Sequence, residues 1–244
     1  MTKFQGKRYW LIGASAGLGR ALAHALAAEG AELVLSARRE DELQELADEL
    51  PTKADVVTLD VSDAGTVDAA MSTIGDFDGV VYLAGVYWPM RSQEWHTDRA
   101  EKMADINFTG AMRVMGRVVP YMLKRNAGHI VLTGSLSGFR GLPGAIGYSA
   151  TKAGVMTLGE SMQADLWDTP IDIQIANPGF IRTRLTDKND FEMPFLMDPE
   201  EAAAEMIKLM RNRRAFVRHF PKLFSLLFRA SRFMPHWLYH RIFA

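Results

Sequence analysis

Tyr148 and Lys152 are the two residues whose types and spacing most directly suggest proton transfer. They lie four positions apart, so in a helix both side chains would share one face. A free phenol has a pKa of about 10 and releases its proton poorly at neutral pH, but a neighbouring ammonium group favours the phenolate. The pair could act as a general acid or base, although such pairs also arise by chance on solvent-exposed helix faces.

Two further polar residues add to this pair. Ser135 precedes Tyr148 by thirteen positions and follows an apolar segment, so its hydroxyl could hold a substrate oxygen, with Ser137 as a less favoured candidate. Asn107 lies inside a long helical pattern, where asparagine is a poor helix former that prefers local hydrogen bonds. We expect Asn107 either to open the helix and hold a water leading from Lys152, or to be an exposed, slightly unfavourable helix residue.

A glycine-rich turn with the spacing G-x-x-x-G-x-G lies near the start of the chain, between an apolar segment and an alanine-rich helical pattern. Glycine lets the backbone approach a pyrophosphate closely, and a helix N-terminus favours phosphate groups. A turn that merely packs a helix on a sheet is the alternative, which the position after a first strand disfavours. The dinucleotide contacts predicted here are Gly13, Ser15, Ala16, Gly17, Leu18 and Gly19.

The residues after the second apolar segment bear on the type of dinucleotide. In NAD-binding folds an acid about 20 residues past the glycine turn holds the ribose hydroxyls, but here Ala37 stands near that place and Arg38 and Arg39 follow. A guanidinium can bind a 2′-phosphate through two parallel hydrogen bonds, whereas an acid would repel it. The pattern predicts NADP rather than NAD, unless both arginines only form a solvated cap before the next helix.

Asp60 and Val61 end the third apolar segment. Asp60 could accept a hydrogen bond from the adenine amino group, with Val61 against the ring. The alternative is that Asp60 caps the following helix, a place that Ser62 or Asp63 could also fill.

These residues must be positioned by an alternation of strands and helices. Strand patterns, apolar on both faces in places, cover Arg8–Ile12, Glu32–Ser36, Asp55–Leu59, Gly79–Leu83, His129–Thr133, Asp172–Ala176 and Ala215–Arg218. Helical patterns cover Leu18–Glu29, Glu40–Leu50, Ala64–Ile74, Asp98–Asn126, Tyr148–Trp167 and Pro199–Arg211. Such alternation predicts a single α/β domain, a Rossmann-like doubly wound sheet of about seven parallel strands with helices on both faces. Its ligand should bind beyond the carboxyl ends of the strands, where the winding reverses.

The composition is that of a globular protein. The 244 residues suffice for one such domain, and 48% are hydrophobic and 23% charged. The absence of cysteine excludes disulfides, thiolate nucleophiles and Cys-ligated zinc and suits a cytoplasmic location. A net charge of -1 provides no overall positive field that would attract nucleic acid. We expect neither a signal peptide nor a membrane span, because no apolar run approaches about 20 residues.

The end of the chain differs in charge from the rest. Nine of the 28 Lys and Arg residues and none of the 29 acids lie after position 205, so the first 205 residues carry a net charge of -10. We expect residues 1–220 to form the catalytic domain and 221–244 a basic amphipathic helical tail, with Pro235 opening a second helix. We expect this tail to pack on the domain or on another subunit rather than to contact an anionic lipid surface. The helical spacing rests on Leu223, Leu226, Leu227 and Ala230.

Together these residues resemble the short-chain dehydrogenase/reductase family over nearly the whole chain, from about residue 7 to 218. The glycine turn is similar to the family's own, and Asn107, Ser135, Tyr148 and Lys152 are similar to its catalytic tetrad, with matching spacing from serine to tyrosine. The resemblance implies that Tyr148 is the acid/base. It also implies that Lys152 lowers its pKa and anchors the nicotinamide ribose, Ser135 orients the substrate, and Asn107 holds a relay water.

A later segment adds to the resemblance. The sequence NPGFIRT, residues 177–183, is similar to the family's Pro-Gly loop after the sixth strand. By this resemblance Thr183 would touch the nicotinamide carboxamide, and Pro178, Gly179 and Ile181 would lie along the ring.

The end of the fourth strand departs from the family pattern. The family usually shows Asn-Asn-Ala-Gly there, whereas this chain has Tyr82, Leu83, Ala84 and Gly85. Ala84 and Gly85 keep the close approach to the adenosine ribose. The missing asparagine bonds to the neighbouring strand put cofactor affinity in question, while the proton-transfer groups are all present.

Two segments rich in aromatic residues and methionine should cover the substrate. They are residues 86–95, with Tyr87, Trp88, Met90 and Trp95, and residues 184–197, with Leu185, Phe191, Met193, Phe195 and Leu196. An apolar or bulky substrate is one interpretation. Partial packing of the same residues into core and lid is the other.

The predicted function is NADP(H)-dependent oxidoreduction, with direct hydride exchange between nicotinamide and a carbonyl or alcohol carbon and without a metal ion. A dinucleotide-binding regulatory protein without turnover is the alternative, and the intact Tyr148, Lys152 and Ser135 argue against it. Lyase, isomerase or epimerase chemistry on the same scaffold is a third possibility that no residue selects. The expected partners are a small carbonyl or alcohol substrate and further copies of the chain, in a homodimer or homotetramer.

Overall fold

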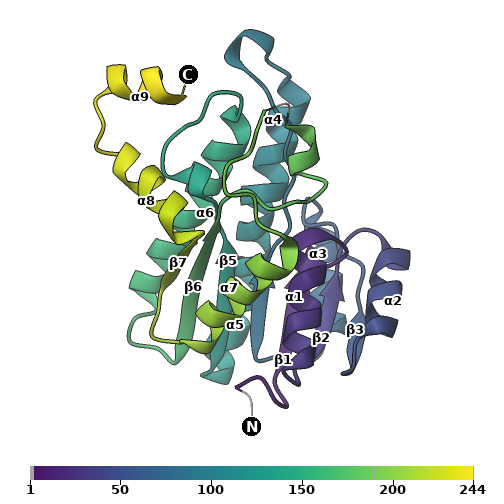
Figure 1. Ribbon diagram of the computed structural model, residues 1–244. Coiled ribbons are helices and arrows are strands. Elements are labelled where there is room, and N and C mark those ends of the chain that lie inside the picture. Colours follow the sequence, from purple (N-terminus) through teal and green to yellow (C-terminus); the bar gives the residue numbers. More distant parts are fainter. Residues whose placement is uncertain (1–2, 190, 244) are drawn as a thin grey trace.

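The structure, a computed structural model that describes residues 3–189 and 191–243, is built around one parallel sheet. Its strand order is β3-β2-β1-β4-β5-β6-β7 (Figure 1). The expected doubly wound parallel sheet is confirmed. The strands are β1 (Arg8–Ile12), β2 (Glu32–Ser36), β3 (Ala54–Val56), β4 (Gly79–Tyr82), β5 (Gly128–Thr133), β6 (Ile171–Pro178) and β7 (Val217–Phe220).

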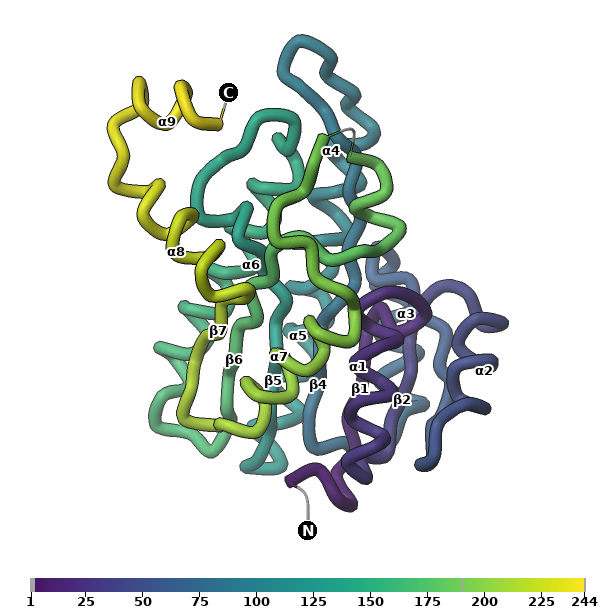
Figure 2. The backbone as a smooth tube through the Cα atoms, in the orientation of Figure 1, coloured from purple at the N-terminus to yellow at the C-terminus, as the bar shows by residue number. Residues whose placement is uncertain are grey.

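Helices cover both faces of the sheet. The helices on one face are α1 (Gly17–Ala28), α2 (Glu40–Glu49) and α7 (Pro199–Arg211), and α1 packs beside α7 (Figure 2). The helices on the other are α3 (Ala64–Thr73), α5 (Gly110–Arg125) and α6 (Ile146–Asp165). Successive strand residues point to opposite faces of the sheet. In β1, Tyr9 and Leu11 are therefore buried in the core on one face, and Trp10 and Ile12 in the core on the other.

The winding reverses at β1, which pairs with β2 on one side and β4 on the other. The connections from β1 and β4 therefore leave in opposite directions and open a crevice at the carboxyl ends of these strands. The short 3-10 helices η1 (Ser92–Glu94), η3 (Leu136–Gly138) and η4 (Thr186–Lys188) all lie in loops that follow β4, β5 and β6 at this end.

Several element boundaries differ from the predicted ones. The strand expected at Asp55–Leu59 ends at Val56, although the Val57 and Leu59 N–H groups still donate to the Leu35 and Ala37 carbonyls. The last strand lies two residues later than expected, at Val217–Phe220. It pairs with residues 175–178 of β6, and this tertiary register, rather than local apolar pattern, decides its ends.

The single helix expected at Asp98–Asn126 is three elements. α4 (Thr97–Met103) leads into a π-helical turn, η2 (Ala104–Thr109), and then into α5. A π turn holds one extra residue per turn and is common at functional sites. It contains Asn107, the residue that the sequence marked as a poor helix former.

The tail forms two helices, α8 (Lys222–Ser231) and α9 (His236–Phe243). Leu223, Leu226 and Leu227, which gave the helical spacing, are exposed, while Phe224 and Phe228 are buried against Leu136 and hold α8 on the domain. Two phenylalanines four positions apart bury more apolar area than the leucines would. Within the described chain no helix is long and apolar enough to cross a membrane.

Candidate active site

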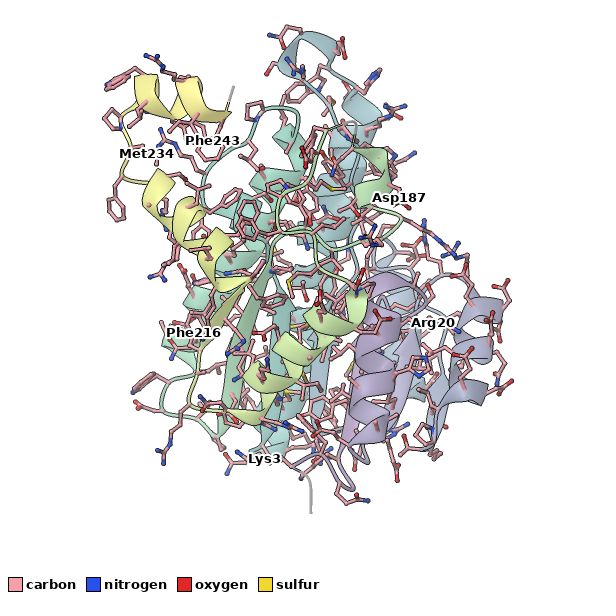
Figure 3. All side chains as sticks on the ribbon, viewed as in Figure 1. Lys3, Arg20, Asp187, Phe216, Met234 and Phe243 are labelled. Atoms are coloured by element: carbon pink, nitrogen blue, oxygen red, sulfur yellow. The ribbon has the colours of Figure 1, made fainter. Side chains whose placement is uncertain are left out.

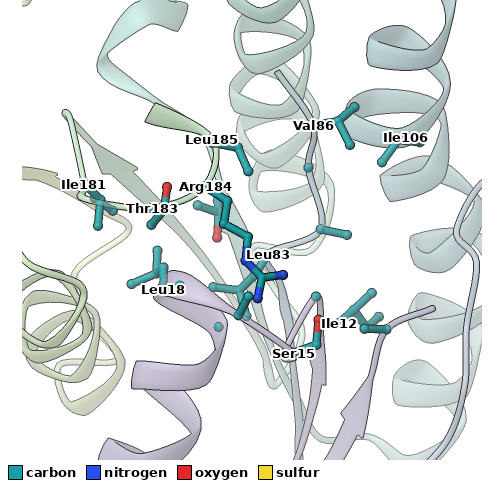
Figure 4. Close-up of a pocket in the computed structure, with 18 of the residues that line it drawn as sticks. Ile12, Ser15, Leu18, Leu83, Val86, Ile106, Ile181, Thr183, Arg184 and Leu185 are labelled. Atoms are coloured by element: carbon teal, nitrogen blue, oxygen red, sulfur yellow. The ribbon is translucent and has the colours of Figure 1, made fainter. Parts of the chain in front are cut away.

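The crevice at the carboxyl ends of β1 and β4 contains a cavity of about 360 Å³. Every residue predicted to contact a dinucleotide lines it, although the residues come from six separate segments of the chain. They are Gly13, Ser15, Ala16, Gly17, Leu18, Gly19, Arg38, Arg39, Asp60, Val61, Ala84, Gly85, Tyr148, Lys152, Pro178, Gly179, Ile181 and Thr183. Sequence analysis did not mark Arg184, whose side chain extends into the same cavity (Figure 4).

The glycine turn leaves no room for side chains at two of its positions. Gly13 has φ +95°, and a Cβ there would lie 2.6 Å from the Ala84 nitrogen. A Cβ on Gly19 would lie 2.1 Å from the Gly13 carbonyl oxygen. α1 begins at Gly17 after Ala16, whose methyl group gives no capping bond. The first N–H groups of α1 are thus free to bind an anion at the cavity.

The two arginines after β2 have different surroundings. Arg39 pairs with Glu42 at 2.6 Å, and Arg184 reaches the same carboxylate at 3.2 Å. Arg38 is exposed at the cavity edge, and no carboxylate of the described residues lies within ion-pair distance of it. Arg38 therefore keeps its guanidinium available for an anionic ligand.

Asp60 does not cap the helix that follows it. Asp63 does, accepting from the Gly65 N–H at 2.7 Å. Asp60 instead accepts from the Ser62 N–H at 2.9 Å and the Ser62 hydroxyl at 2.6 Å. Burial alone would raise the pKa of Asp60, but these hydrogen bonds and the charge of Arg38 bring it below its usual value. The carboxylate is thus ionised at the cavity wall.

Tyr148 stands in the first turn of α6, where the large cavity meets a smaller one of about 110 Å³. Tyr148 lines both, and Ser135 lines the smaller one. Ser135 is close enough to the Tyr148 hydroxyl to act on the pKa of the phenol. Ser137 also lines this cavity but donates its hydroxyl to Ser135 at 3.0 Å. The geometry therefore favours Ser135 over Ser137 as the partner of Tyr148.

Burial dominates the protonation of Tyr148. It raises the pKa of the phenol to about 12, the Ser135 hydrogen bond offsets only part of this rise, and Tyr87 adds to it. Lys152 was expected to lower the pKa of Tyr148, but the net effect of the chain's own residues is to raise it. Lys152 Nζ lies 5.6 Å from the centre of the Tyr148 ring, and desolvation outweighs attraction at that range.

Lys152 is buried and forms part of the cavity wall. Its Nζ donates to the Thr133 carbonyl at 2.9 Å, and burial lowers the pKa of the amine to about 8. An ammonium group has three N–H donors. Among the described residues, the Thr133 carbonyl is the hydrogen-bond acceptor for one of them. Two donors remain for a ligand in the cavity that Lys152 lines.

Asn107 is fully buried, so its interpretation as an exposed helix residue is wrong. Its Oδ1 accepts from the Val86 N–H at 2.7 Å, and its Nδ2 donates to the Val86 carbonyl at 2.9 Å and to Thr151 at 3.1 Å. A Cβ on Gly85 would lie 3.4 Å from Asn107 Oδ1 and 3.7 Å from Lys152 Nζ. Asn107 thus braces the chain after β4 and stands on the same side of Gly85 as Lys152.

Tyr82 takes over a bracing role at the strand end that departs from the family pattern. It is buried, and its hydroxyl donates to the Ile106 carbonyl at 2.7 Å. A Cβ on Gly110 would lie 2.8 Å from that hydroxyl. The Tyr82 side chain thus ties the end of β4 to the π turn and packs against the start of α5.

The loop after β6 closes the crevice on the other side. Thr183 packs on the glycine turn, because a Cβ on Gly17 would lie 2.8 Å from its methyl group. Ile181 is buried and is bridged to Met197, which anchors the loop at both ends. Thr183 therefore lines the cavity directly beside the glycine turn.

The two segments expected to cover the substrate contribute unequally to the smaller cavity. Tyr87, Leu185 and Phe191 line it, whereas Trp95 and Phe195 are not among its lining residues. Sequence analysis missed several apolar residues of the cavity wall, among them Leu136, Leu142, Phe180, Phe224 and Phe228. The i, i+4 spacing of the last two was the signal that could have marked them.

Comparison with known proteins agrees with this geometry. The family model of the short chain dehydrogenases matches residues 7–193. An uncharacterized oxidoreductase of Myxococcus xanthus is 37% identical over 246 residues, 98% of this chain and 97% of that protein. One of Staphylococcus epidermidis is 33% identical over 78% of this chain and 85% of its own length.

Solved structures give the same result. A short chain dehydrogenase/reductase of Burkholderia phymatum in complex with NAD has a TM-score of 0.83 at 25% identity, over 94% of each chain. A short-chain dehydrogenase of Sphingobium yanoikuyae in complex with NADPH has a TM-score of 0.82 at 25% identity, over 93% of this chain and 94% of that one. The chain belongs to the short-chain dehydrogenase/reductase family and is an oxidoreductase of that family.

Proposed function

We propose that the protein is an NADP(H)-dependent oxidoreductase that interconverts an apolar carbonyl compound and its alcohol, with Tyr148 as general acid and base. One observation carries this proposal. Tyr148, with Ser135 in the smaller cavity and buried Lys152 in the larger one, stands where the two cavities meet. Such a place allows one proton donor to serve a reacting atom between two ligands.

The residues of the large cavity fit a nicotinamide dinucleotide. The glycine turn offers the close approach and free N–H groups that a pyrophosphate needs. Lys152 has donors left for ribose hydroxyls, and Asp60 is an ionised acceptor at the wall that follows β3. When bound, the nicotinamide supplies or accepts the hydride, and the chain's own residues position the substrate and move the proton.

The choice of NADP over NAD rests on the end of β2. Ala37 brings no carboxylate to the cavity, and Arg38 stands there without an acidic partner among the described residues. A 2′-phosphate gains a charge-assisted bond at such a place, whereas an NAD ribose gains none.

The proton step follows from the two pKa values. With a pKa of about 12, the Tyr148 phenol keeps its proton at neutral pH and can donate it to a substrate oxygen held by Ser135. Lys152, with a pKa of about 8, is still mostly charged there and favours the phenolate that remains. In the reverse direction the same phenolate accepts the proton of the alcohol.

The substrate class follows from the smaller cavity. Its polar side chains are those of Tyr87, Ser135, Ser137, Tyr148, Thr186 and Asn189, and none of its described lining residues carries a charge. An ionised substrate would find no counter-charge there, whereas an apolar body would contact Leu136, Phe180 and Phe228.

The test is to follow NADPH absorbance with a panel of aliphatic and aromatic carbonyl compounds. Tyr148→Phe should lower kcat by roughly 100-fold to 10,000-fold, the range of a lost general acid, while NADPH affinity stays within about twofold, because the ring that lines the cavity remains. A wild-type protein that binds NADPH tightly but turns over no carbonyl or alcohol would overturn the proposal. So would a Tyr148→Phe variant with full activity.

A further inference from the structure

The outer side of the C-terminal helices is an apolar surface that the domain does not cover. Leu223, Leu226 and Leu227 point away from the domain on α8, while Phe224 and Phe228 face inward. The surface continues past α8 with Phe233, 89% exposed, and along α9 with Trp237, 68% exposed, and Ile242. We call these six residues, Leu223, Leu226, Leu227, Phe233, Trp237 and Ile242, the outer face.

The outer face is unusual for this molecule. Of the 13 large apolar side chains exposed in the described chain, these six lie within 20 residues of sequence. Scattered exposed apolar residues are normal, but a gathered patch marks an interaction surface. Figure 3 shows this region, around the labelled Met234 and Phe243, at one edge of the molecule.

The exposure does not come from a detached tail. Arg140 donates to the Ser231 carbonyl and to the Met234 carbonyl at 2.9 Å, and its guanidinium lies 4.0 Å from the centre of the Tyr239 ring. The Tyr239 hydroxyl in turn donates to the Gly141 carbonyl. These bonds hold α8 and α9 on the loop between β5 and α6, so the outer face is presented in a defined orientation.

The charge around the outer face has one sign. Lys222, Arg229, Arg232 and Arg241 lie on the same two helices, and residues 206–244 contain no Asp or Glu. None of these four cations has an ion-pair partner in the described part of the chain. The other residues, 1–220, carry 24 basic and 29 acidic groups, so the cations gather where the apolar surface is.

We propose that the outer face docks on an anionic lipid surface. Apolar side chains that enter the headgroup boundary, beside Lys and Arg that meet anionic headgroups, are the features of an interfacial helix pair. A second copy of the chain is a poorer occupant. A two-fold contact would place the outer face on itself, and four cations would then meet four cations without an acid between them.

Docking would bring the lipid next to the substrate cavity. Phe224 and Phe228 form part of the cavity wall from the inner side of α8, and the outer face lies on the opposite side of the same helix. An apolar substrate dissolved in the bilayer would then be one helix thickness from the cavity. This consequence rests on the proposed function, whereas the docking itself does not.

The experiment is co-sedimentation of the full chain with vesicles of phosphatidylcholine alone and with added phosphatidylglycerol. We expect binding to the mixed vesicles that weakens at high salt, and little binding to phosphatidylcholine alone. Trp237→Gln should weaken binding roughly tenfold, equivalent to about 1.4 kcal/mol. Trp167→Gln is the matched control, because Trp167 is 74% exposed on another part of the surface and should bind like wild type.

Three outcomes would overturn the proposal: no binding to either vesicle, equal binding to both, or equal loss in the two tryptophan variants. Analytical ultracentrifugation without lipid tests the rival occupant, and a dimer that Trp237→Gln dissociates would assign the outer face to a second copy. NADPH oxidation without vesicles should be unaffected by Trp237→Gln, so failure of docking and failure of the proposed function are separable.

Discussion

At Tyr148 and Lys152, burial acts against the charged form of each group. It raises the pKa of the phenol to about 12 and lowers that of the amine to about 8. Neighbour spacing in the sequence indicates only that the two side chains share a helix face, and it does not show that burial raises the pKa of the phenol. The depth of the surrounding protein, which comes from loops distant in sequence, decides which form is stable.

Arg38 and Arg39 offer a matched test of cofactor choice. Arg38→Asp should lower the preference for NADPH over NADH by about 10-fold to 100-fold, as expected for the loss of a charge-assisted hydrogen bond. Arg39→Asp should have a smaller effect, because Glu42 already engages the Arg39 guanidinium. Fluorescence titration with both nucleotides gives the affinities. An unchanged preference in Arg38→Asp would rule out the assignment.

His129 is a buried group whose protonation should control acid stability. It bonds to the Tyr9 hydroxyl at 2.9 Å and to Gln174 at 2.8 Å, and burial lowers its pKa from 6.5 to about 3. Below pH 6.5 the His129 imidazole is therefore protonated in the unfolded chain, whereas in the folded chain it stays neutral down to about pH 3. Stability falls as the pH falls through this window, by about 1.4 kcal/mol per pH unit.

His129→Gln should remove this dependence. Urea unfolding at pH 7 and pH 5 measures it, and the difference between the two pH values is compared so that a general loss of stability cancels. We expect a smaller difference in the variant than in wild type. Equal differences would mean that other groups cause the acid sensitivity.

Among the elements, α7 shows what local sequence can determine. Its bounds, Pro199–Arg211, are those predicted. Proline stands in the first turn, and Asp198 and Glu201 form a capping box, with the Asp198 N–H bonded to Glu201 at 3.0 Å. Start signals of this kind lie within four residues of each other. The π turn before α5 has no capping signal of this kind, because it depends on the contact of Asn107 with Val86 and on the hydrogen bond from Tyr82 of β4 to the Ile106 carbonyl.

The junction of β1 and α1 can be tested with two glycines. Gly19→Ala should destabilise the fold by about 1–3 kcal/mol, the usual cost of overpacking, and abolish NADPH binding, because its Cβ would overlap the Gly13 carbonyl. Gly116→Ala is the matched control at an exposed position of α5, with no atom within 4 Å of its Cβ. It should stabilise by up to about 1 kcal/mol. Urea unfolding measures both, and a neutral Gly19→Ala would contradict the role of the turn.

At the scale of the whole molecule, the chain brings its two ends to one site. Residues 13–19 supply the glycine turn, while α8 supplies Phe224 and Phe228 to the adjoining cavity. The division into a catalytic domain of residues 1–220 and a tail is therefore functional only in part, because the tail also forms a wall of the proposed substrate site. Its inner face serves the domain, and its outer face, with unpaired cations, remains available to another surface.

The sequence alone determined the alternation of strands and helices, the parallel sheet, the glycine turn and the grouping of Asn107, Ser135, Tyr148 and Lys152. These features depend on local periodicity, backbone freedom and the rule that carboxyl ends of parallel strands share one edge. Only the tertiary structure decided the protonation of Tyr148, the inward turn of Asn107 and which face of α8 is buried. Each of these depends on the atoms that distant segments of the chain place around a residue. The spacing of residues along the sequence does not show which segments those are.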